Sequence, residues 1–115
     1  MGKFLNKITG FMGERQAVSY LKKQGYKILA TNYTTKLGEI DIIARQKDEI
    51  VFVEVKTRLT TEFGLPREAV TSYKQNKIRL VATEYLKKTS QLNAKCRCDV
   101  IEILDKKLTH LINAF

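Results

Sequence analysis

The stretch FVEVKTR, from Phe52 to Arg58, places an acid and a base on one face of an apolar strand. Side chains alternate along a strand, so Glu54 and Lys56 point to one side of it while Val53 and Val55 point to the other. A surface ion pair and a catalytic pair both fit this spacing. The choice between them depends on which side chains lie opposite the pair in the folded sheet.

The residues before this stretch predict the other half of a hairpin. Segments 38–45 and 49–57 are rich in apolar residues and bracket a short polar turn around Lys47 and Asp48, a pattern typical of two antiparallel strands. A turn centred between Lys47 and Asp48 leaves one face of the hairpin wholly apolar, so we expect that face to be buried. Its members are Ile40, Ile42, Ala44, Val51, Val53 and Val55.

The opposite face of the hairpin becomes charged at the end away from the turn. In the same register Asp41 faces Glu54, and Glu39 faces Lys56, with Cβ atoms about 5 Å apart. Two such carboxylates can share a divalent cation, and the Lys56 ammonium can position a metal-bound water or stabilise charge during phosphodiester hydrolysis. The alternative is an exposed ion pair between Glu39 and Lys56 beside weakly repelling carboxylates. A slip of one residue would put Asp41 and Glu54 on opposite faces.

Glu14 adds a carboxylate from a predicted N-terminal helix. With Ala17 and Leu21 it forms a stripe at positions i, i+3 and i+7 on the face expected to meet the sheet. A carboxylate on a buried face needs a partner. The sequence leaves two kinds of partner open, which are a metal ion or water at the charged site, and a salt bridge to Lys56 or Arg58.

Length and charge restrict the class of protein. The chain has 115 residues, enough for one domain spanning residues 1–115 with a hydrophobic core of its own. Its 21 Lys and Arg against 12 Asp and Glu give a net charge of +9, which favours a polyanionic partner, nucleic acid first and a membrane surface second. Because the sequence has no apolar run of about 18 residues and no signal-peptide pattern, we expect a cytoplasmic protein without a membrane segment. Cys96 and Cys98 are expected to be small buried side chains of a strand.

The hydrophobic patterns predict the element order αβββαββ. A helical repeat from Phe4 to Leu21 ends before Gly25, which suits a position just after a helix. The remaining elements are predicted as strands at 26–33, 38–45, 49–57, 96–104 and 108–113 and a second helix at 66–86. This order indicates an α/β (α+β) domain with helices that cover a mostly antiparallel sheet.

Several segments together carry a family resemblance. They are GER.A..YLKKQGYKIL, GEIDIIA, FVEVKTR, CDVIEI and INAF, and with the residues between them they span nearly the whole chain. This combination resembles the YraN family of small bacterial proteins, which is similar to archaeal Holliday junction resolvases and to the PD-(D/E)xK, or restriction-endonuclease-like, nucleases. The resemblance implies a mixed central sheet flanked by helices and DNA cleavage that depends on Mg²⁺ or Mn²⁺.

The same resemblance implies roles for individual residues. Asp41 matches the Asp of the motif, and Glu54 and Lys56 match its (D/E)xK part. Glu14 falls where related resolvases place a helix glutamate near the metal, and the backbone carbonyl of Val55 would be a further metal ligand. The chain departs from the motif at residue 40, where isoleucine replaces proline.

Contacts to nucleic acid are expected on the second helix and at the end of the charged strand. Arg58 has the strand parity of Lys56 and is a candidate phosphate contact. Lys74, Gln75 and Lys77 lie where similar nucleases place polar helix residues beside the site. For Gln75 the alternative is a capping box with Ser72 at the start of the helix.

The favoured hypothesis is therefore a divalent-metal-dependent endonuclease that acts on DNA, branched DNA included, and a homodimer is left open. The alternative from a different class is a nucleic-acid-binding protein that retains the nuclease fold without catalysis. A third interpretation is a basic scaffold protein that neither binds nor cuts DNA. Metal titration in the presence of DNA separates the three.

Overall fold

The predicted order of elements is confirmed by the computed structural model, which describes residues 2–58 and 70–115, with side chains from residue 12 onward. The elements are α1 (Gly2–Lys23), β1 (Lys27–Thr35), β2 (Gly38–Gln46), β3 (Glu49–Arg58), α2 (Ser72–Lys88), β4 (Lys95–Leu104) and β5 (Lys107–Leu111). The predicted start of the second helix, at residues 66–69, lies outside the described residues.

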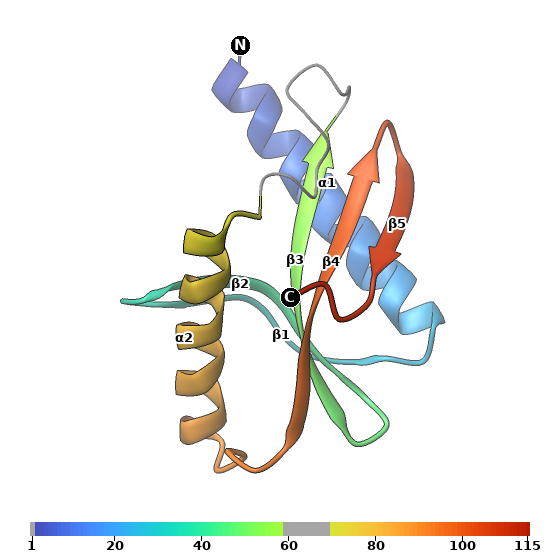
Figure 1. Ribbon diagram of the computed structural model, residues 1–115. Coiled ribbons are helices and arrows are strands. Elements are labelled where there is room, and N and C mark those ends of the chain that lie inside the picture. The colour runs from blue at the N-terminus through green and yellow to red at the C-terminus, as the bar shows by residue number, and fades with distance from the viewer. Residues whose placement is uncertain (1, 59–69) are drawn as a thin grey trace.

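The five strands form one mixed sheet in the order β1-β2-β3-β4-β5. The β1–β2, β2–β3 and β4–β5 pairs are antiparallel, and β3 and β4 are parallel. A parallel pair needs a connection that crosses from one end of the sheet to the other, and α2 lies within that connection. The two helices cover opposite faces of the sheet (Figure 1), so the fold is a mixed α/β arrangement of three layers.

Each face of the sheet has its own hydrophobic core. Under α1, the buried side chains are Ala17, Leu21, Tyr26, Ile42, Ala44, Val51, Val53, Ile101 and Ile103. Under α2, they are Ile40, Ile43, Ile50, Phe52, Ile78, Val81, Ala82, Leu86 and Cys98. The central strands alternate between the two clusters, which is why they read as nearly continuous apolar runs in the sequence.

The ends of the helices follow local rules. Gly25 has a φ of +91°, and the Tyr26 N–H donates to the Leu21 carbonyl across the end of α1, as predicted for a glycine after a helix. The predicted capping box at Ser72 is wrong by one position, because Thr71 is the N-cap of α2 and its hydroxyl accepts from the Lys74 N–H at 3.2 Å.

The predicted β2–β3 register is correct near the turn and wrong beyond it. Pairs from Gln46 with Glu49 to Ile42 with Val53 match the prediction, but the ladder ends there. β2 continues to pair with β1 as far as Gly38 and leaves β3 at this point (Figure 1).

The departing arm changes the burial of Ile40. The arm passes over α2, where an added Cβ at Gly38 would lie 3.5 Å from Val81. As a result Ile40 is buried in the cluster under α2, not with Ile42 on the other face as predicted.

The structure also bears on the predictions for the two cysteines and for a membrane segment. Cys98 is buried as expected, but Cys96 is exposed because it lies at the beginning of β4. Among the helices described, none combines the length and apolar character that crossing a bilayer requires.

Candidate active site at the fork between β2 and β3

The point where β2 leaves β3 forms a fork, and Asp41 occupies it. Its Oδ2 accepts a hydrogen bond of 2.7 Å from the Val55 N–H. In a continued ladder that N–H would bond to the backbone of Ile40, so a side-chain carboxylate has replaced a strand carbonyl. Asp41 is therefore held by the backbone of β3, and the two strands separate at the position where the sequence carries its charges.

Glu54 lies on the α2 side of this fork. Its side chain is only 8% exposed, and its Oε1 lies 3.3 Å from the Lys56 Nζ and 3.6 Å from the Lys74 Nζ. The Lys56 side chain is also mostly buried, at 12% exposure. Lys56 pairs with Glu102 of β4 in the sheet register. This contradicts the exposed Glu39–Lys56 pair that was the alternative interpretation.

Glu14 reaches the same fork from the α1 side. Its carboxylate lies beside the Asp41 side chain, and both groups line the same cavity. The Asn32 amide is assigned so that its nitrogen faces Glu14. This nitrogen donates to both carboxylate oxygens of Glu14 at 3.2 Å. Asn32 lies in β1 between residues paired with Ile42 and Ile40, which places it across from Asp41. The structure thus brings Glu14 to the carboxylates of the fork, and a metal ion or water as its partner stays a prediction.

A close approach of α1 to β3 positions Glu14. Gly13 has so little space that an added Cβ would lie 3.1 Å from Thr57 Cβ and would overlap the Thr57 hydroxyl. Only a residue without a side chain permits this contact. Glu14 follows directly in the helix, so the glycine determines how near its carboxylate comes to Asp41.

Burial and crowding of like charges shift the ionisation of the site. Burial, the neighbouring Glu54 charge and the Glu14 charge raise the pKa of Asp41 to about 8, although the hydrogen bond from Val55 opposes them. Burial, followed by the charges of Glu39 and Glu54, raises the pKa of Glu14. Burial and the adjacent Lys74 ammonium lower the pKa of Lys56, against the attraction of Glu54. The carboxylates thus lie where a cation would offset their mutual repulsion.

The donor set fits a hard cation that retains several waters. In residues 12–58 and 70–115, no group of three or more Asp, Glu, His and Cys side chains stands ready to enclose a metal. Two carboxylates, Asp41 and Glu54, with a backbone carbonyl would suit Mg²⁺ or Mn²⁺, since Mg²⁺ is usually held by one or two carboxylates and water. The N–H and C=O of one strand residue point to the same neighbouring strand. Because the Val55 N–H points to Asp41, its carbonyl is directed to the same gap.

The residues predicted to bind nucleic acid divide into two groups. Lys74 joins the site through its contact with Glu54. The other three have contacts near their own elements. Arg58 donates to the Thr57 carbonyl at 3.2 Å, and Gln75 donates to the Val70 carbonyl at 3.2 Å. The Lys77 ammonium lies 5.3 Å from the centre of the Tyr73 ring. Within the described residues, these contacts leave Lys74 as the member of the set that touches the carboxylates.

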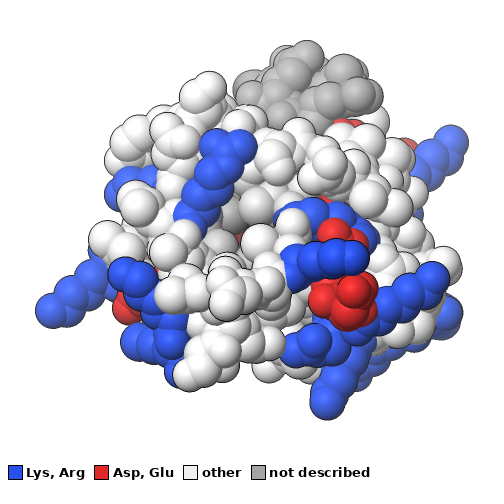
Figure 2. All heavy atoms as spheres, turned by 60° about the horizontal axis from the view of Figure 1, so that its bottom comes forward, with Lys and Arg blue, Asp and Glu red and all other residues white. Residues whose placement is uncertain are grey.

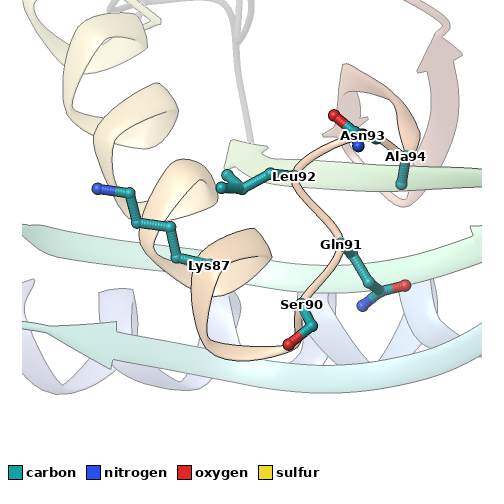
Figure 3. Close-up of a pocket in the computed structure, with 6 residues that line it drawn as sticks. All are labelled: Lys87, Ser90, Gln91, Leu92, Asn93 and Ala94. Atoms are coloured by element: carbon teal, nitrogen blue, oxygen red, sulfur yellow. The ribbon is translucent and has the colours of Figure 1, made fainter.

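Cavities on the described surface differ in chemistry. One, of about 400 Å³, opens beside Glu14 and Asp41 between α1 and strands β1 and β2. The other, of about 580 Å³, lies at the connection from α2 to β4, where Lys87 and Leu92 are among its lining residues (Figure 3). Acidic side chains are absent from the lining of the second cavity, so the carboxylate chemistry belongs to the first.

Some contacts in the structure were not predicted from the sequence. In the sequence, Asn32 gave no signal apart from its position in a predicted strand. In the structure its φ is 50°, a conformation that asparagine tolerates better than most residues. Asp99 is completely buried, forms an ion pair with Arg97 at 3.0 Å and shares a hydrogen bond of 2.7 Å with His110. His110 also contacts the Tyr20 hydroxyl at 3.0 Å. The spacing of Arg97 and Asp99 on one strand face was the available signal for this network.

Fold and site together define a small mixed α/β protein with a carboxylate and lysine cluster in the fork of its sheet. The family model described as "Uncharacterised protein family UPF0102" matches residues 13–103, so the chain belongs to this family, and the YraN-like resemblance is confirmed at that level. The matched segment contains every residue of the cluster.

Relatives align along nearly their whole length. A UPF0102 protein of Clostridioides difficile (strain 630) is 50% identical over 112 residues, which cover 96% of this chain and 98% of the relative. One from Caldanaerobacter subterraneus subsp. tengcongensis is 47% identical over 122 residues, with both chains fully covered. One from Alkaliphilus oremlandii is 50% identical over 117 residues, covering 96% of this chain and all of the relative.

Proposed function

We propose that this protein is a DNA endonuclease that hydrolyses phosphodiester bonds with Mg²⁺ or Mn²⁺, and that its fold is a variant of the restriction-endonuclease-like arrangement. The observation that carries the proposal is the fork itself. There Asp41 and Glu54 come from different strands and meet side chain to side chain, with the Lys56 ammonium 3.3 Å from Glu54. Both the mixed sheet with a helix on each face and the net charge of +9 support it.

Each residue has a task that its surroundings allow. Asp41 and Glu54, with the Val55 carbonyl, would hold the cation, and Glu14 would add a negative charge beside it. A bound divalent cation would supply Lewis-acid activation of the phosphoryl group. The Lys56 ammonium, anchored by Glu54 and mostly buried, would stabilise negative charge that develops on the phosphate, in a site where poor solvation strengthens the interaction. Lys74 would support the same charge from α2.

The basic surface supplies a means of attracting DNA. On the face shown in Figure 2, Lys and Arg cover more of the surface than Asp and Glu do, and acidic groups lie among the basic ones. Such a distribution accelerates association with a polyanion and makes its affinity strongly dependent on salt.

The test is strand scission of branched, flapped and linear DNA in the presence of Mg²⁺, Mn²⁺ or a chelator. We expect scission that needs the metal, and a loss of about 100-fold or more in the Asp41→Asn and Lys56→Ala variants. The first variant loses a ligand of the cation, and the second loses the ammonium that stabilises negative charge in the transition state. Asp48→Asn and Lys95→Ala are matched controls. These two residues form an ion pair of 3.5 Å whose side chains are 75% and 76% exposed, far from the fork in the sheet register.

Two results would contradict the proposal. One is equal scission by the wild type and both fork variants. The other is DNA binding that tolerates the chelator, with no scission of any substrate, which would indicate a binding protein that retains the fold without catalysis.

A further inference from the structure

A cleft leads away from the carboxylates along α1. We call it the α1–β1 cleft. Its volume is about 400 Å³, which lies in the range of ligand-binding pockets. The side chains that line it are Glu14, Arg15, Val18, Ser19 and Lys22 from α1, Thr31 and Asn32 from β1, and Asp41 and Ile42 from β2. It therefore shares Glu14 and Asp41 with the proposed active site.

The cleft is lined by two carboxylates and by two basic side chains. Glu14 and Asp41 lie together at one end. Ser19 and Lys22 follow at later turns of the same helix face, and both are exposed. Arg15 follows Glu14 in α1 and adds a cation beside the carboxylates, and Lys22 lies about 12 Å further along the helix at 1.5 Å per residue.

We infer that the α1–β1 cleft binds the sugar-phosphate backbone of one DNA strand next to the bond that is cut. This inference rests on the proposed function, since it takes the carboxylate end as the place of the scissile phosphate. The neighbouring phosphates contact the Ser19 hydroxyl and the Lys22 ammonium.

The arrangement of the other lysines favours this path over one across α2. Lys74 is engaged by Glu54 inside the fork, and Lys77 lies over the Tyr73 ring. Lys22 lies in the last turn of α1, where a cation also faces the negative end of the helix dipole. Phosphate contacts of this kind fix the position of DNA without reading its sequence.

The closing experiment compares two adjacent lysines of α1. Lys22 and Lys23 are both exposed and both in the last turn, but Lys22 lines the cleft and Lys23 does not. Fluorescence anisotropy would measure binding of a labelled 20-nucleotide single strand and a flapped duplex, in EDTA and in Ca²⁺, with gel analysis to show that the probe stays intact. Affinities would be taken over a series of salt concentrations for the wild type, Lys22→Gln, Lys23→Gln and Ser19→Lys.

We expect Lys22→Gln to weaken binding and to reduce the slope of log affinity against log salt by about one, the value for one lost phosphate contact. Lys23→Gln should keep the wild-type slope, and Ser19→Lys should steepen it by about one. Equal slopes for the two glutamine variants, with wild-type binding intact, would overturn the cleft as the path and leave the endonuclease proposal standing. If the wild type binds neither probe, the proposed function and the path both fail.

Discussion

At the scale of single residues, Asp41 performs two tasks with one carboxylate. It satisfies the Val55 N–H where the ladder ends, and it faces Glu14 and Glu54 in the fork. The backbone hydrogen bond fixes the position of the group, and the crowded charges make it bind a cation or a proton strongly. The same carboxylate therefore both ends the strand ladder and provides the site for a cation or a proton.

The raised pKa of Asp41 predicts how stability depends on pH. In the folded protein the pKa is about 8, against an ordinary value of 3.8. The folded state therefore holds a proton that the unfolded chain has lost, so stability falls as pH rises from about 4 to about 8. Mg²⁺ or Mn²⁺ should replace this proton, and we expect either ion to raise the Tm more at pH 8 than at pH 6.

Thermal unfolding followed by circular dichroism checks this prediction. Asp41→Asn should remove most of the fall in Tm between pH 6 and pH 8 and most of the metal effect, because it removes the titrating group. Asp48→Asn, at an exposed position, should keep both. A wild-type metal effect that is the same at both pH values would contradict the assignment of Asp41 as a ligand.

At the scale of elements, the site depends on how closely α1 approaches β3. Gly13 lies against Thr57, with room for no Cβ. Within a helix, Gly→Ala ordinarily stabilises by about 1 kcal/mol. Here we expect the opposite sign, a loss of about 1 to 3 kcal/mol in the free energy of unfolding for Gly13→Ala, since the added methyl overpacks the contact.

The same substitution should lower DNA cleavage, because displacement of α1 moves Glu14 relative to Asp41. Chemical denaturation gives the stability change. Ser19→Ala on the exposed face of the same helix is the control for helix propensity and should stabilise slightly. Combining Gly13→Ala with Thr57→Ala should recover part of the loss, whereas Thr57→Ser should not. A stabilised Gly13→Ala protein would show that the contact is not close.

At the scale of the whole molecule, a buried polar network stabilises the part of the sheet nearer the β2–β3 turn. Arg97 of β4 donates to Glu49 of β3 at 2.6 Å and to the Tyr26 hydroxyl at 2.7 Å. Asp99 accepts from the Asn113 N–H at 2.9 Å and contacts His110 of β5. The network therefore joins three strands to the end of α1 and secures the chain terminus, while the fork lies further along β3.

The Asp99→Asn variant tests how much this network contributes to the free energy of unfolding. Burial alone would raise the pKa of Asp99. Hydrogen bonds from His110 and Arg97 outweigh this effect and hold the pKa below its ordinary value. A depressed acid stabilises the fold above its unfolded pKa, so this contribution is lost only in acid, below about pH 4. Removing the charge should cost about 3 to 5 kcal/mol at neutral pH, because Arg97 and His110 lose a buried partner.

Urea denaturation measures this loss, and Asp48→Asn should change stability by less than about 0.5 kcal/mol. The two variants remove the same chemical group from a buried and an exposed position. An Asp99→Asn protein as stable as the wild type would mean that the network is dispensable for folding.

The sequence by itself determined the elements and the inner part of the hairpin. The order αβββαββ, the glycine that follows α1 and the pairing around Lys47 and Asp48 all follow from local patterns, since periodicity and turn chemistry involve neighbours along the chain. It also singled out Asp41, Glu54 and Lys56, because acids and bases on buried strands are costly without a purpose.

Only the tertiary structure decided how these residues meet. Asp41 and Glu54 were predicted to face each other across a continuous ladder. Instead β2 and β3 separate at this point, because the β1–β2 arm packs over α2 and the Asp41 side chain accepts the hydrogen bond of the Val55 N–H. Lys74 and Asn32 enter the site from α2 and β1, outside the β2–β3 hairpin. Such contacts depend on packing between elements, which the periodicity of one segment does not encode. The sequence identifies the charged side chains, and the fold sets the distances between them.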